Sequence, residues 1–381
     1  MKVVLFANTE WYLYNFRRSL ALALRDAGHE VLLVSPPGPY GARLQDMGFR
    51  WVAAPMDRRS LNPLRELALV LWLKRLLTEE QVDLVHGFTI KCAVYGSIAA
   101  RLAARSPGVP ARVNAVAGMG YVFTSNDLKA RLLRPVVRSL LKLALGGPGA
   151  RLVLQNPDDL ALFERARLVD TAQVRLIPGS GVNCERFSPA LLQQQPDAAE
   201  GFCVVLPARL LWDKGLAEYV EATRQLKAEG RNIRCQLAGD PDPGNPAAVP
   251  EATVRGWVKE GLMEWLGHVE DMPALFASVH AVVLPSYREG LPKGLIEAGA
   301  CALPLVTTDV PGCREVVQDN VNGLMVPVKD ASALARAIAR LQDDPALRQR
   351  LGAAARATAL AEFDERKVIE RTVGVYYELL A

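Results

Sequence analysis

Short apolar runs alternate with longer amphipathic segments from the first residues of this chain. Apolar runs cover residues 3–8, 30–35 and 83–88, and segments with helical spacing at 16–27 and 65–77 lie between them. Strands that alternate with helices are typical of parallel sheets covered by helices. We therefore predict an α/β fold for the first half of the chain.

The same alternation returns after residue 200, where residues 216–229 have a helical pattern. Four further apolar runs lie at 202–208, 235–240, 281–286 and 303–309. Residues 178–200 are rich in Pro, Gly and Gln and have no periodicity, which is typical of a linker. The second half is therefore predicted to be a second doubly wound sheet.

The length of 381 residues also fits two domains, and half of the residues are apolar, enough for sizeable cores. We place the domains at 1–185 and 186–381, with the last helix able to pack back on the first. Ligands of such proteins usually occupy the inter-domain cleft. Their binding groups are expected at the carboxyl ends of strands.

Several protein classes are disfavoured by composition. No apolar run reaches the roughly 18 residues that span a bilayer. The apolar stretch at the start of the sequence is too short for a signal peptide. We expect a cytoplasmic protein. Six cysteines without a C-x-x-C pair and four dispersed histidines predict reduced thiols and no metal site.

The charged residues are divided unevenly between the two halves of the chain. Residues 1–190 contain 25 Lys+Arg and 15 Asp+Glu, whereas residues 191–381 contain 20 and 26. A basic half favours an anionic partner, either nucleic acid or the lipid headgroups of a membrane. No recognisable nucleic-acid motif or pattern of stacking aromatics accompanies it, so we expect no nucleic acid.

Residues 281–301 combine a predicted strand, a polar turn and a predicted helix. Glu289 ends the turn, Gly290 and Leu291 follow it, and Glu297 lies in the helix. Amides at the start of such a helix can face an anion, and the two carboxylates can accept hydrogen bonds from hydroxyl groups. Two glutamates at a helix start are also common as solvated, dipole-favoured residues.

A second candidate lies in LPARLLWDKG, where Arg209 and Lys214 follow a predicted strand and precede a helix. An arginine fork and a lysine point charge at a strand end suit a diphosphate, although two surface cations in a loop are equally common. Gly239 lies at the end of the next predicted strand. Neither a Walker A loop nor a G-x-G-x-x-G follows any strand.

Together these segments resemble glycosyltransferase family 4. Its E-x7-E signature matches Glu289 and Glu297, and its R-x4-K pair matches Arg209 and Lys214. The similarity continues through WLGHVEDMPALFASVHAVVLPSYREG and VTTDVPGCREVVQDNVNGLMVP. The resemblance implies the GT-B fold, two facing Rossmann-like domains with a cleft between them.

The resemblance also implies a reaction: transfer of a hexose or N-acetylhexosamine from a nucleotide diphosphate sugar, with UDP as the expected carrier, and retention of anomeric configuration. Arg209 and Lys214 would neutralise the leaving diphosphate, so no metal and no cofactor is expected. Glu297 would hold the ribose, Glu289 the donor sugar, and Gly239, Gly290 and Leu291 would line the donor site.

Further segments, HGFTIKCAVYGSIAARLA, NAVAGMGYVFTS and LQNPDDLALF, are similar to a subgroup that acts on undecaprenyl-diphosphate-linked sugars. That subgroup includes the N-acetylgalactosaminyl transferases that extend diacetylbacillosamine, and it works in bacterial surface polysaccharide or glycan assembly. Where many family members have glycines, this chain has Asn8–Tyr12 without one. The acceptor-side residues expected from the resemblance are Trp11, Tyr14, Asn15, Lys91, Gly118, Gly120 and Tyr121.

His86 and Lys91 flank another predicted strand end. We expect His86 to face the cleft as a catalytic residue and Lys91 to meet the acceptor diphosphate, although a structural histidine and a solvated lysine are the common alternatives. In residues 129–142, cations recur at helical spacings among Leu and Val, namely Arg131, Arg134, Arg138 and Lys142. This segment predicts either contact with the inner membrane or a helix with a basic outer face.

Two other functions use the same architecture. A non-hydrolysing sugar-nucleotide epimerase needs acid/base carboxylates in both halves, and the E-x7-E spacing argues against it. A non-catalytic sugar-nucleotide-binding protein is disfavoured because Arg209, Lys214, Glu289 and Glu297 occur together.

Overall fold

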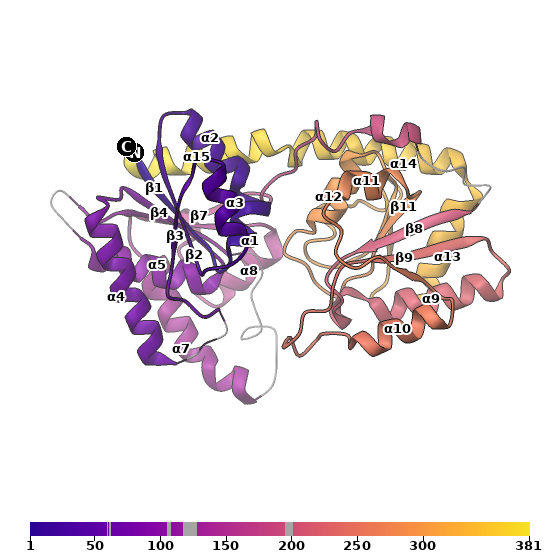
Figure 1. Ribbon diagram of the computed structural model, residues 1–381, viewed down its shortest axis with the longest axis horizontal. Coiled ribbons are helices and arrows are strands. Elements are labelled where there is room, and N and C mark those ends of the chain that lie inside the picture. The colour runs from indigo at the N-terminus through magenta and orange to yellow at the C-terminus, as the bar shows by residue number, and fades with distance from the viewer. Residues whose placement is uncertain (59, 61, 105–107, 117–127, 195–200) are drawn as a thin grey trace. The chain divides into compact units, whose positions relative to one another are not determined.

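The computed structural model describes residues 1–58, 60, 62–104, 108–116, 128–194 and 201–381 (Figure 1). The chain forms two compact units, Met1–Ser180 with Lys367–Ala381, and Gly181–Arg366. The unit boundary therefore lies a few residues before the predicted one. Most of the last helix, α15 (Glu365–Leu380), belongs to the first unit.

The first unit is built on a parallel sheet of seven strands in the order β3-β2-β1-β4-β5-β6-β7. Its central strands are buried on both faces, which explains their continuous apolar sequences. The predicted α/β class is confirmed here. The strands are β1 (Lys2–Phe6), β2 (Glu30–Ser35), β3 (Arg50–Ala53), β4 (Leu84–Phe88), β5 (Ala111–Ala115), β6 (Ala150–Leu154) and β7 (Val174–Leu176).

Helices cover both faces of this sheet (Figure 1). On one face α5 packs between α4 and α7, and on the other α2 and α15 bury apolar side chains against β1. The helices are α1 (Glu10–Tyr12), the π-helix η1 (Leu13–Arg17), α2 (Arg18–Asp26), α3 (Tyr40–Asp46), α4 (Pro63–Glu79), α5 (Ile90–Leu102), α7 (Leu128–Leu145), α8 (Pro157–Arg165) and the 3-10 turn η2 (Thr171–Gln173).

The second unit contains a parallel sheet of six strands in the order β10-β9-β8-β11-β12-β13. The second predicted doubly wound sheet is thus also confirmed. Its strands are β8 (Phe202–Pro207), β9 (Ile233–Ala238), β10 (Glu264–Trp265), β11 (Ala281–Leu284), β12 (Leu305–Thr308) and β13 (Leu324–Val326).

The helices of this unit again form two layers, in which α9 packs with α13 and α12 packs with α14. They are η3 (Pro189–Gln194), η4 (Trp212–Lys214), α9 (Leu216–Ala228), α10 (Glu251–Lys259), α11 (Met272–Ala277), α12 (Lys293–Ala300), α13 (Ala331–Asp343), α14 (Pro345–Thr358) and the π-helix η5 (Ala359–Phe363).

Local sequence explains where several helices begin. Asn62 accepts hydrogen bonds from the amides of Leu64 and Arg65, and Pro63 occupies the first helical position of α4. Asp344 caps α14 in the same way, with a proline after it. Such caps satisfy amides that have no partner inside the helix.

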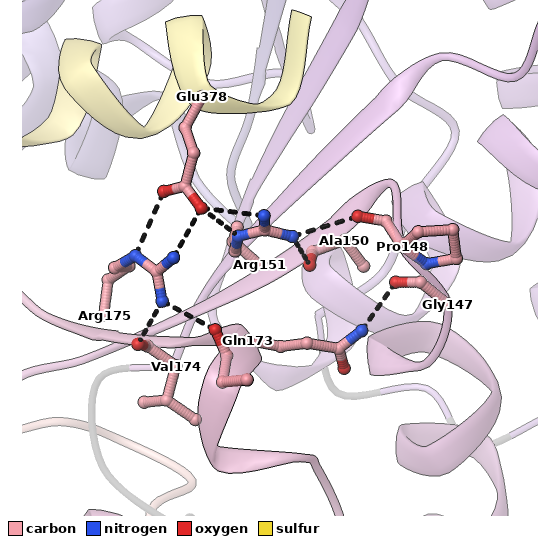
Figure 2. A network of polar contacts seen from close by, with 9 residues as sticks. Gly147, Pro148, Ala150, Arg151, Gln173, Val174, Arg175 and Glu378 are labelled. Atoms are coloured by element: carbon pink, nitrogen blue, oxygen red, sulfur yellow. Dashed lines mark hydrogen bonds and ion pairs between the residues drawn. The ribbon is translucent and has the colours of Figure 1, made fainter. Parts of the chain in front are cut away.

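The last helix is held to the first sheet by one carboxylate shared between two arginines (Figure 2). Arg151 of β6 donates from Nε to Glu378 at 2.9 Å, and Arg175 of β7 donates from Nε at 3.1 Å. The same arginines also donate to backbone carbonyls, of Pro148 and Ala172 among others. Both guanidinium groups are thus oriented before they meet Glu378.

We predict that Glu378→Gln lowers the free energy of unfolding by about 1 kcal/mol at pH 7, the upper end for partly exposed ion pairs. Arg175 and Arg151 hold the pKa of Glu378 below its ordinary value of 4.5. Its stabilising contribution is therefore present above pH 4.5 and is lost as the pH falls through the folded-state pKa. Urea unfolding of wild type and variant at several pH values measures the difference.

Glu79→Gln serves as the control, because Glu79 makes an exposed i,i+4 pair with Arg75 on α4. Its effect should stay within about 0.5 kcal/mol. Equal losses in the two variants at pH 7 would show that Glu378 does not have the special role assigned to it.

Candidate functional site

The strand order of the second unit reverses between β8 and β11. The chain passes from β8 to β9 on one side and returns to β11 on the other, so the loops after β8 and β11 diverge at their carboxyl ends. Open α/β sheets bind ligands in the crevice at this position. The predicted donor-site residues follow the strands on either side of it.

Lys214 and Glu289 meet across this reversal. Lys214 Nζ lies 2.6 Å from Glu289 Oε1, and both side chains are largely buried. Ser286, which is fully buried, donates a hydrogen bond to the same oxygen at 2.5 Å. The Glu289 carboxylate is therefore held between a cation and a hydroxyl, and the structure brings together two residues that are distant in sequence.

Two glycines permit this approach. Gly215 has a φ of 75°, and a Cβ there would lie 2.1 Å from the carbonyl oxygen of Pro285. Gly312 has a φ of 86°, and its Cβ would lie 2.5 Å from the carbonyl oxygen of Glu289. Because these conformations and distances exclude a side chain, glycine is required at both positions.

Arg209 does not share the partner of Lys214. Its Nη1 lies 2.8 Å from Asp242 Oδ2, and the guanidinium is mostly exposed. Gly239, at the end of β9, lies against Ala208: a Cβ on it would be 2.0 Å from the Ala208 carbonyl oxygen. The Gly239 amide donates to Gly267, so this glycine allows two loops to touch and its amide is used within the fold.

Glu297 lies on the second turn of α12. Burial raises the pKa of its carboxyl, and Lys293, 3.5 Å away, opposes that rise. Leu291 packs against the core of the unit, and Gly290 separates it from Glu289. The predicted E-x7-E pair thus consists of one carboxylate that is ion-paired with a lysine of another loop and one that is buried on the helix.

The predicted position of His86 is wrong. His86 is in the middle of β4, and only 1% of its surface is exposed. Its Nδ1 forms a hydrogen bond of 2.5 Å with the hydroxyl of Tyr376 on α15, and its ring contacts Phe88. Burial holds the pKa of His86 well below its usual range, so the ring is neutral and joins α15 to the sheet.

Lys91 is also employed inside the fold. Its Nζ pairs with Glu66 at 2.8 Å and donates to the carbonyl oxygens of Asp57 and Ser60. An ammonium group has three N–H donors, and these contacts account for all of them. The expectation that Lys91 meets an acceptor diphosphate is therefore corrected to a structural role for this side chain.

The remaining acceptor-side candidates follow β1. Trp11 is 39% exposed, and its ring makes an edge contact with Phe16. The ring of Tyr14 lies 5.2 Å from that of Tyr40, and Asn15 donates to the Trp11 carbonyl oxygen. Three further candidates, Gly118, Gly120 and Tyr121, lie outside the described residues.

Both units match models of glycosyltransferase domains. Residues 201–344 match the family described as glycosyl transferases group 1, and residues 15–179 match the glycosyl transferase 4-like domain. Together the two matches span most of the chain, which belongs to the glycosyltransferases. These matches also argue against the sugar-nucleotide epimerase.

Similar proteins extend over nearly the whole transferase. It is 27% identical over 384 residues, 99% of this chain and 98% of the relative, to the Campylobacter jejuni N,N'-diacetylbacillosaminyl-diphospho-undecaprenol alpha-1,3-N-acetylgalactosaminyltransferase. It is also 27% identical over 327 residues to the Escherichia coli UDP-Gal:alpha-D-GlcNAc-diphosphoundecaprenol alpha-1,3-galactosyltransferase, covering 83% of this chain and 80% of that one.

Solved structures show the same fold. Anabaena Alr3699/HepE in complex with UDP and glucose is similar with a TM-score of 0.79 at 20% identity, over 99% of both chains. WaaG, a glycosyltransferase involved in lipopolysaccharide biosynthesis, is similar with a TM-score of 0.75 at 17% identity, over 98% of this chain and 99% of that one. The predicted GT-B fold of the transferase, with its two Rossmann-like domains, is confirmed.

Sequence reasoning missed three residues that shape this site: Ser286, Gly312 and Asp242. Ser286 lies two residues after β11, so its place near a strand end was a usable signal. Gly312 contacts Glu289, and Asp242 pairs with Arg209. No local sequence pattern predicts either contact. Within the described ranges, no group of three or more His, Cys, Asp or Glu residues is arranged to hold a metal ion.

We predict that Glu297→Gln raises the free energy of unfolding of the transferase at neutral pH. Because burial raises the pKa of Glu297 above its ordinary 4.5, ionising this carboxyl costs more in the folded than in the unfolded state. The cost is absent well below pH 4.5, where both states are protonated, and develops as the pH rises through the folded-state pKa. Urea unfolding at pH 4 and pH 7.5 measures it.

Glu251→Gln is the matched control, since Glu251 is an exposed glutamate paired with Arg255 on α10. We expect that variant to lose up to about 0.5 kcal/mol. A Glu297→Gln variant that is less stable than wild type at pH 7.5 would contradict the assignment of Glu297 as an energetically costly carboxylate.

Proposed function

We propose that this transferase moves a hexose or N-acetylhexosamine from a UDP-sugar to a sugar on an undecaprenyl-diphosphate carrier, in bacterial glycan assembly. The observation that carries the proposal is the Lys214–Glu289 pair at the strand reversal of the second unit. Two relatives whose names specify undecaprenyl-diphosphate-linked sugars support the acceptor. HepE, crystallised with UDP and glucose, supports the donor.

The cations of the second unit would stabilise the leaving group. As the bond between the anomeric carbon and the diphosphate oxygen breaks, negative charge grows on UDP, where Arg209 and Lys214 can replace their carboxylate partners Asp242 and Glu289 with phosphate oxygens. Glu289, released from Lys214, can then accept hydrogen bonds from the donor sugar. Glu297 would take the ribose hydroxyls.

The second half of the reaction needs a proton acceptor. An acceptor hydroxyl attacks the anomeric carbon on the face that UDP leaves, and its proton passes to the departing phosphate oxygen. This arrangement retains the anomeric configuration and uses no protein nucleophile. The protein contributes position and fixed charge, which is sufficient where the diphosphate is already neutralised by two cations.

We predict that Arg209→Ala and Lys214→Ala each lower kcat by about 10²-fold or more, as expected for one lost group that stabilises transition-state charge. Transfer is measured with a panel of nucleotide sugars and polyprenyl-diphosphate-linked acceptors, and NMR of the product reports its anomeric configuration. Arg224→Ala is the control, because Arg224 is an exposed arginine on α9 paired with Glu221 and Glu260.

Two results would overturn parts of this scheme. Near-normal rates in both variants would contradict the diphosphate site. Loss of transfer on addition of EDTA, with recovery on addition of a divalent cation, would contradict the proposal that the reaction needs no metal.

We further propose that the first unit contacts the cytoplasmic face of the inner membrane, where the lipid-linked acceptor would be found. None of the described helices has the length and apolar composition to cross a bilayer. Among the predicted cations of α7, Arg134, Arg138 and Lys142 line one hollow on the surface. The side chain of Arg131 lies outside the described residues. Each cation near anionic headgroups adds about 1 kcal/mol.

An apolar stripe on the same face of the sheet supports this orientation. On α4, Leu64, Leu67 and Leu71 are 77%, 55% and 51% exposed, and their i, i+3, i+7 spacing places them on one side of the helix. Helix α5 separates α4 from α7, so leucines and cations lie on one layer of the unit (Figure 1). Exposed leucines and cations on one layer of a unit are typical of surfaces that lie in a membrane interface.

We predict that Leu64→Gln/Leu67→Gln/Leu71→Gln weakens binding to vesicles containing phosphatidylglycerol by at least about tenfold, since each leucine loses on the order of 1 kcal/mol of burial. Arg138→Gln/Lys142→Gln should weaken binding mainly at low salt. Leu380→Gln, which alters an exposed leucine of α15 on the opposite face of the sheet, is the control. Cosedimentation with the vesicles measures binding. Wild-type affinity in both the triple leucine variant and the double cation variant would contradict the proposal that this face of the first unit contacts the membrane.

A further inference from the structure

Two arginines approach one glycine turn at the amino ends of β5 and β6. Arg101 lies near the end of α5, Arg112 is the second residue of β5, and the turn at residues 146–149 joins α7 to β6. A Cβ on Gly147 would lie 3.3 Å from Arg101 Nη2 and 3.5 Å from Arg112 Nη2. The two guanidinium groups therefore converge on one point of the turn.

Arg112 is a buried cation whose side chain has no partner within the described ranges. The residue is 5% exposed, and its Nε and Nη1 atoms are buried without a hydrogen bond. Arg101 donates from Nη2 to the Gly146 carbonyl oxygen, but its buried Nε also lacks an acceptor. Neither arginine forms an ion pair with a carboxylate of the described chain. Their positive charges are therefore uncompensated.

A further buried donor on the same face of β5 lacks an acceptor. Asn114 is 1% exposed, and Ser97 of α5 donates to its Oδ1 at 2.7 Å, which leaves Nδ2 unpartnered among the described residues. Asn114 shares a face with Arg112, because alternate residues of a strand point to the same side. Buried donors are rarely left unsatisfied in native structures, and a bound water or ion commonly accounts for the exceptions. The missing partner is therefore an acceptor of hydrogen bonds.

The charge of the two arginines favours an anion over water. Burial and the neighbouring Arg101 lower the pKa of Arg112 to about 10, so both guanidinium groups are charged at neutral pH and repel each other. A bound anion compensates both charges, whereas a water molecule leaves the repulsion in place. A phosphate that is free or in a monoester carries a charge of about −1.5 to −2 at pH 7, so it matches two cations better than a carboxylate does.

One phosphate group is large enough to reach both arginines. A charge-assisted hydrogen bond from a guanidinium nitrogen to a phosphate oxygen is about 2.8 Å long, and each guanidinium offers a planar fork of donors. Both Nη2 atoms lie within 3.5 Å of the same point beside Gly147. Their separation is therefore short enough for a single tetrahedral oxyanion to bridge them.

A surface hollow beside the turn gives an ion access. The residues that line it include Lys142, Gly146, Gly147, Glu164, Arg167 and Asp170. The two cations and two acids of this rim balance, so the excess positive charge comes from the two arginines at the turn. Gln173 fixes the turn by donating to the Gly147 carbonyl oxygen at 2.7 Å (Figure 2).

We propose that Arg101, Arg112 and the turn at residues 146–149 form a binding site for a phosphate group, either free or as a phosphomonoester. Substrates of open α/β sheets bind at the carboxyl ends of strands, whereas this site is at the amino ends of β5 and β6. The ligand is thus distinct from the substrates of the transfer reaction, and it stabilises the first unit by compensating two buried cations. The inference does not depend on the proposed function.

Thermal unfolding in phosphate and in chloride buffers of equal ionic strength tests the site. Saturating inorganic phosphate should raise the Tm of wild type by about 3 °C or more, because a ligand that binds only the folded state stabilises it. Arg112→Met should abolish this response. It should also raise the Tm in chloride, because it removes a buried charge that has no partner in the described chain.

Arg101→Gln provides a second variant in case Arg112→Met does not fold, since Arg101 is only partly buried. The loss of one charged donor should raise the Kd for inorganic phosphate at least about tenfold, as measured by isothermal titration calorimetry. An unchanged Kd would refute the joint role of the two arginines.

Two further variants are controls. Arg151→Met removes an arginine of β6 that is paired with Glu378, so it should lower the Tm and keep the response to phosphate. Lys214→Ala removes a cation of the donor site, which can also attract phosphate, and it should keep the response that Arg112→Met loses. The reverse result, a response lost in Lys214→Ala and kept in Arg112→Met, would assign the phosphate effect to the donor site.

Vesicle binding separates a free phosphate from a lipid headgroup. Phosphatidic acid carries a phosphomonoester, whereas phosphatidylglycerol carries a phosphodiester. If the ligand is a free phosphate, Arg112→Met and wild type should bind both kinds of vesicle equally. A preference for phosphatidic acid that is lost in Arg112→Met would identify a lipid as the source of the phosphate group. The proposal is overturned if Arg112→Met alters neither the response to inorganic phosphate nor the vesicle preference.

Discussion

The pairing of β11 with β8 is the constraint on which the donor side of this glycosyltransferase depends. Parallel pairing brings the carboxyl ends of both strands to one edge, and the change of direction in strand order separates the loops that follow. Lys214 and Glu289 meet there although 75 positions separate them in the chain. The contact further requires the absence of a side chain at Gly215, against which the Pro285 carbonyl lies.

Buried charges in this chain fall into two groups with different physical meaning. In one group each carboxylate has a partner, as with Glu66 and Lys91 or Asp364 and Arg366, and the pair connects elements of one unit. In the other, represented by Glu297, burial raises the pKa of the carboxyl although Lys293 lies 3.5 Å away. Such a carboxylate lowers stability at neutral pH, which is expected where a side chain is kept for a ligand.

The contacts of the last helix show that His86 has a structural role. Tyr376 binds His86 inside the sheet, and Glu378 binds Arg151 and Arg175 at its edge. One turn of α15 thus contacts β4, β6 and β7 together. The histidine that sequence position suggests for catalysis is a buried hydrogen-bonding partner, because a strand residue in a doubly covered sheet points into a helix layer.

The sequence by itself determined the α/β class, the two doubly wound halves and the donor motifs. Strand and helix periodicity is local, and Glu289 and Glu297 belong to one strand–helix junction whose spacing can be read directly. Arg209 and Lys214 are likewise close together in the chain. Their predicted placement at strand ends follows from the order of elements alone.

Only the tertiary structure decided which groups touch. It paired Lys214 with Glu289 and Arg209 with Asp242, employed Lys91 inside the fold, and placed the Glu10 carboxylate against Gly38. It also showed that the leucine stripe of α4 faces outward although its periodicity would equally suit a buried face. Local spacing specifies elements, whereas contacts between distant segments depend on strand order and on the space that glycines leave.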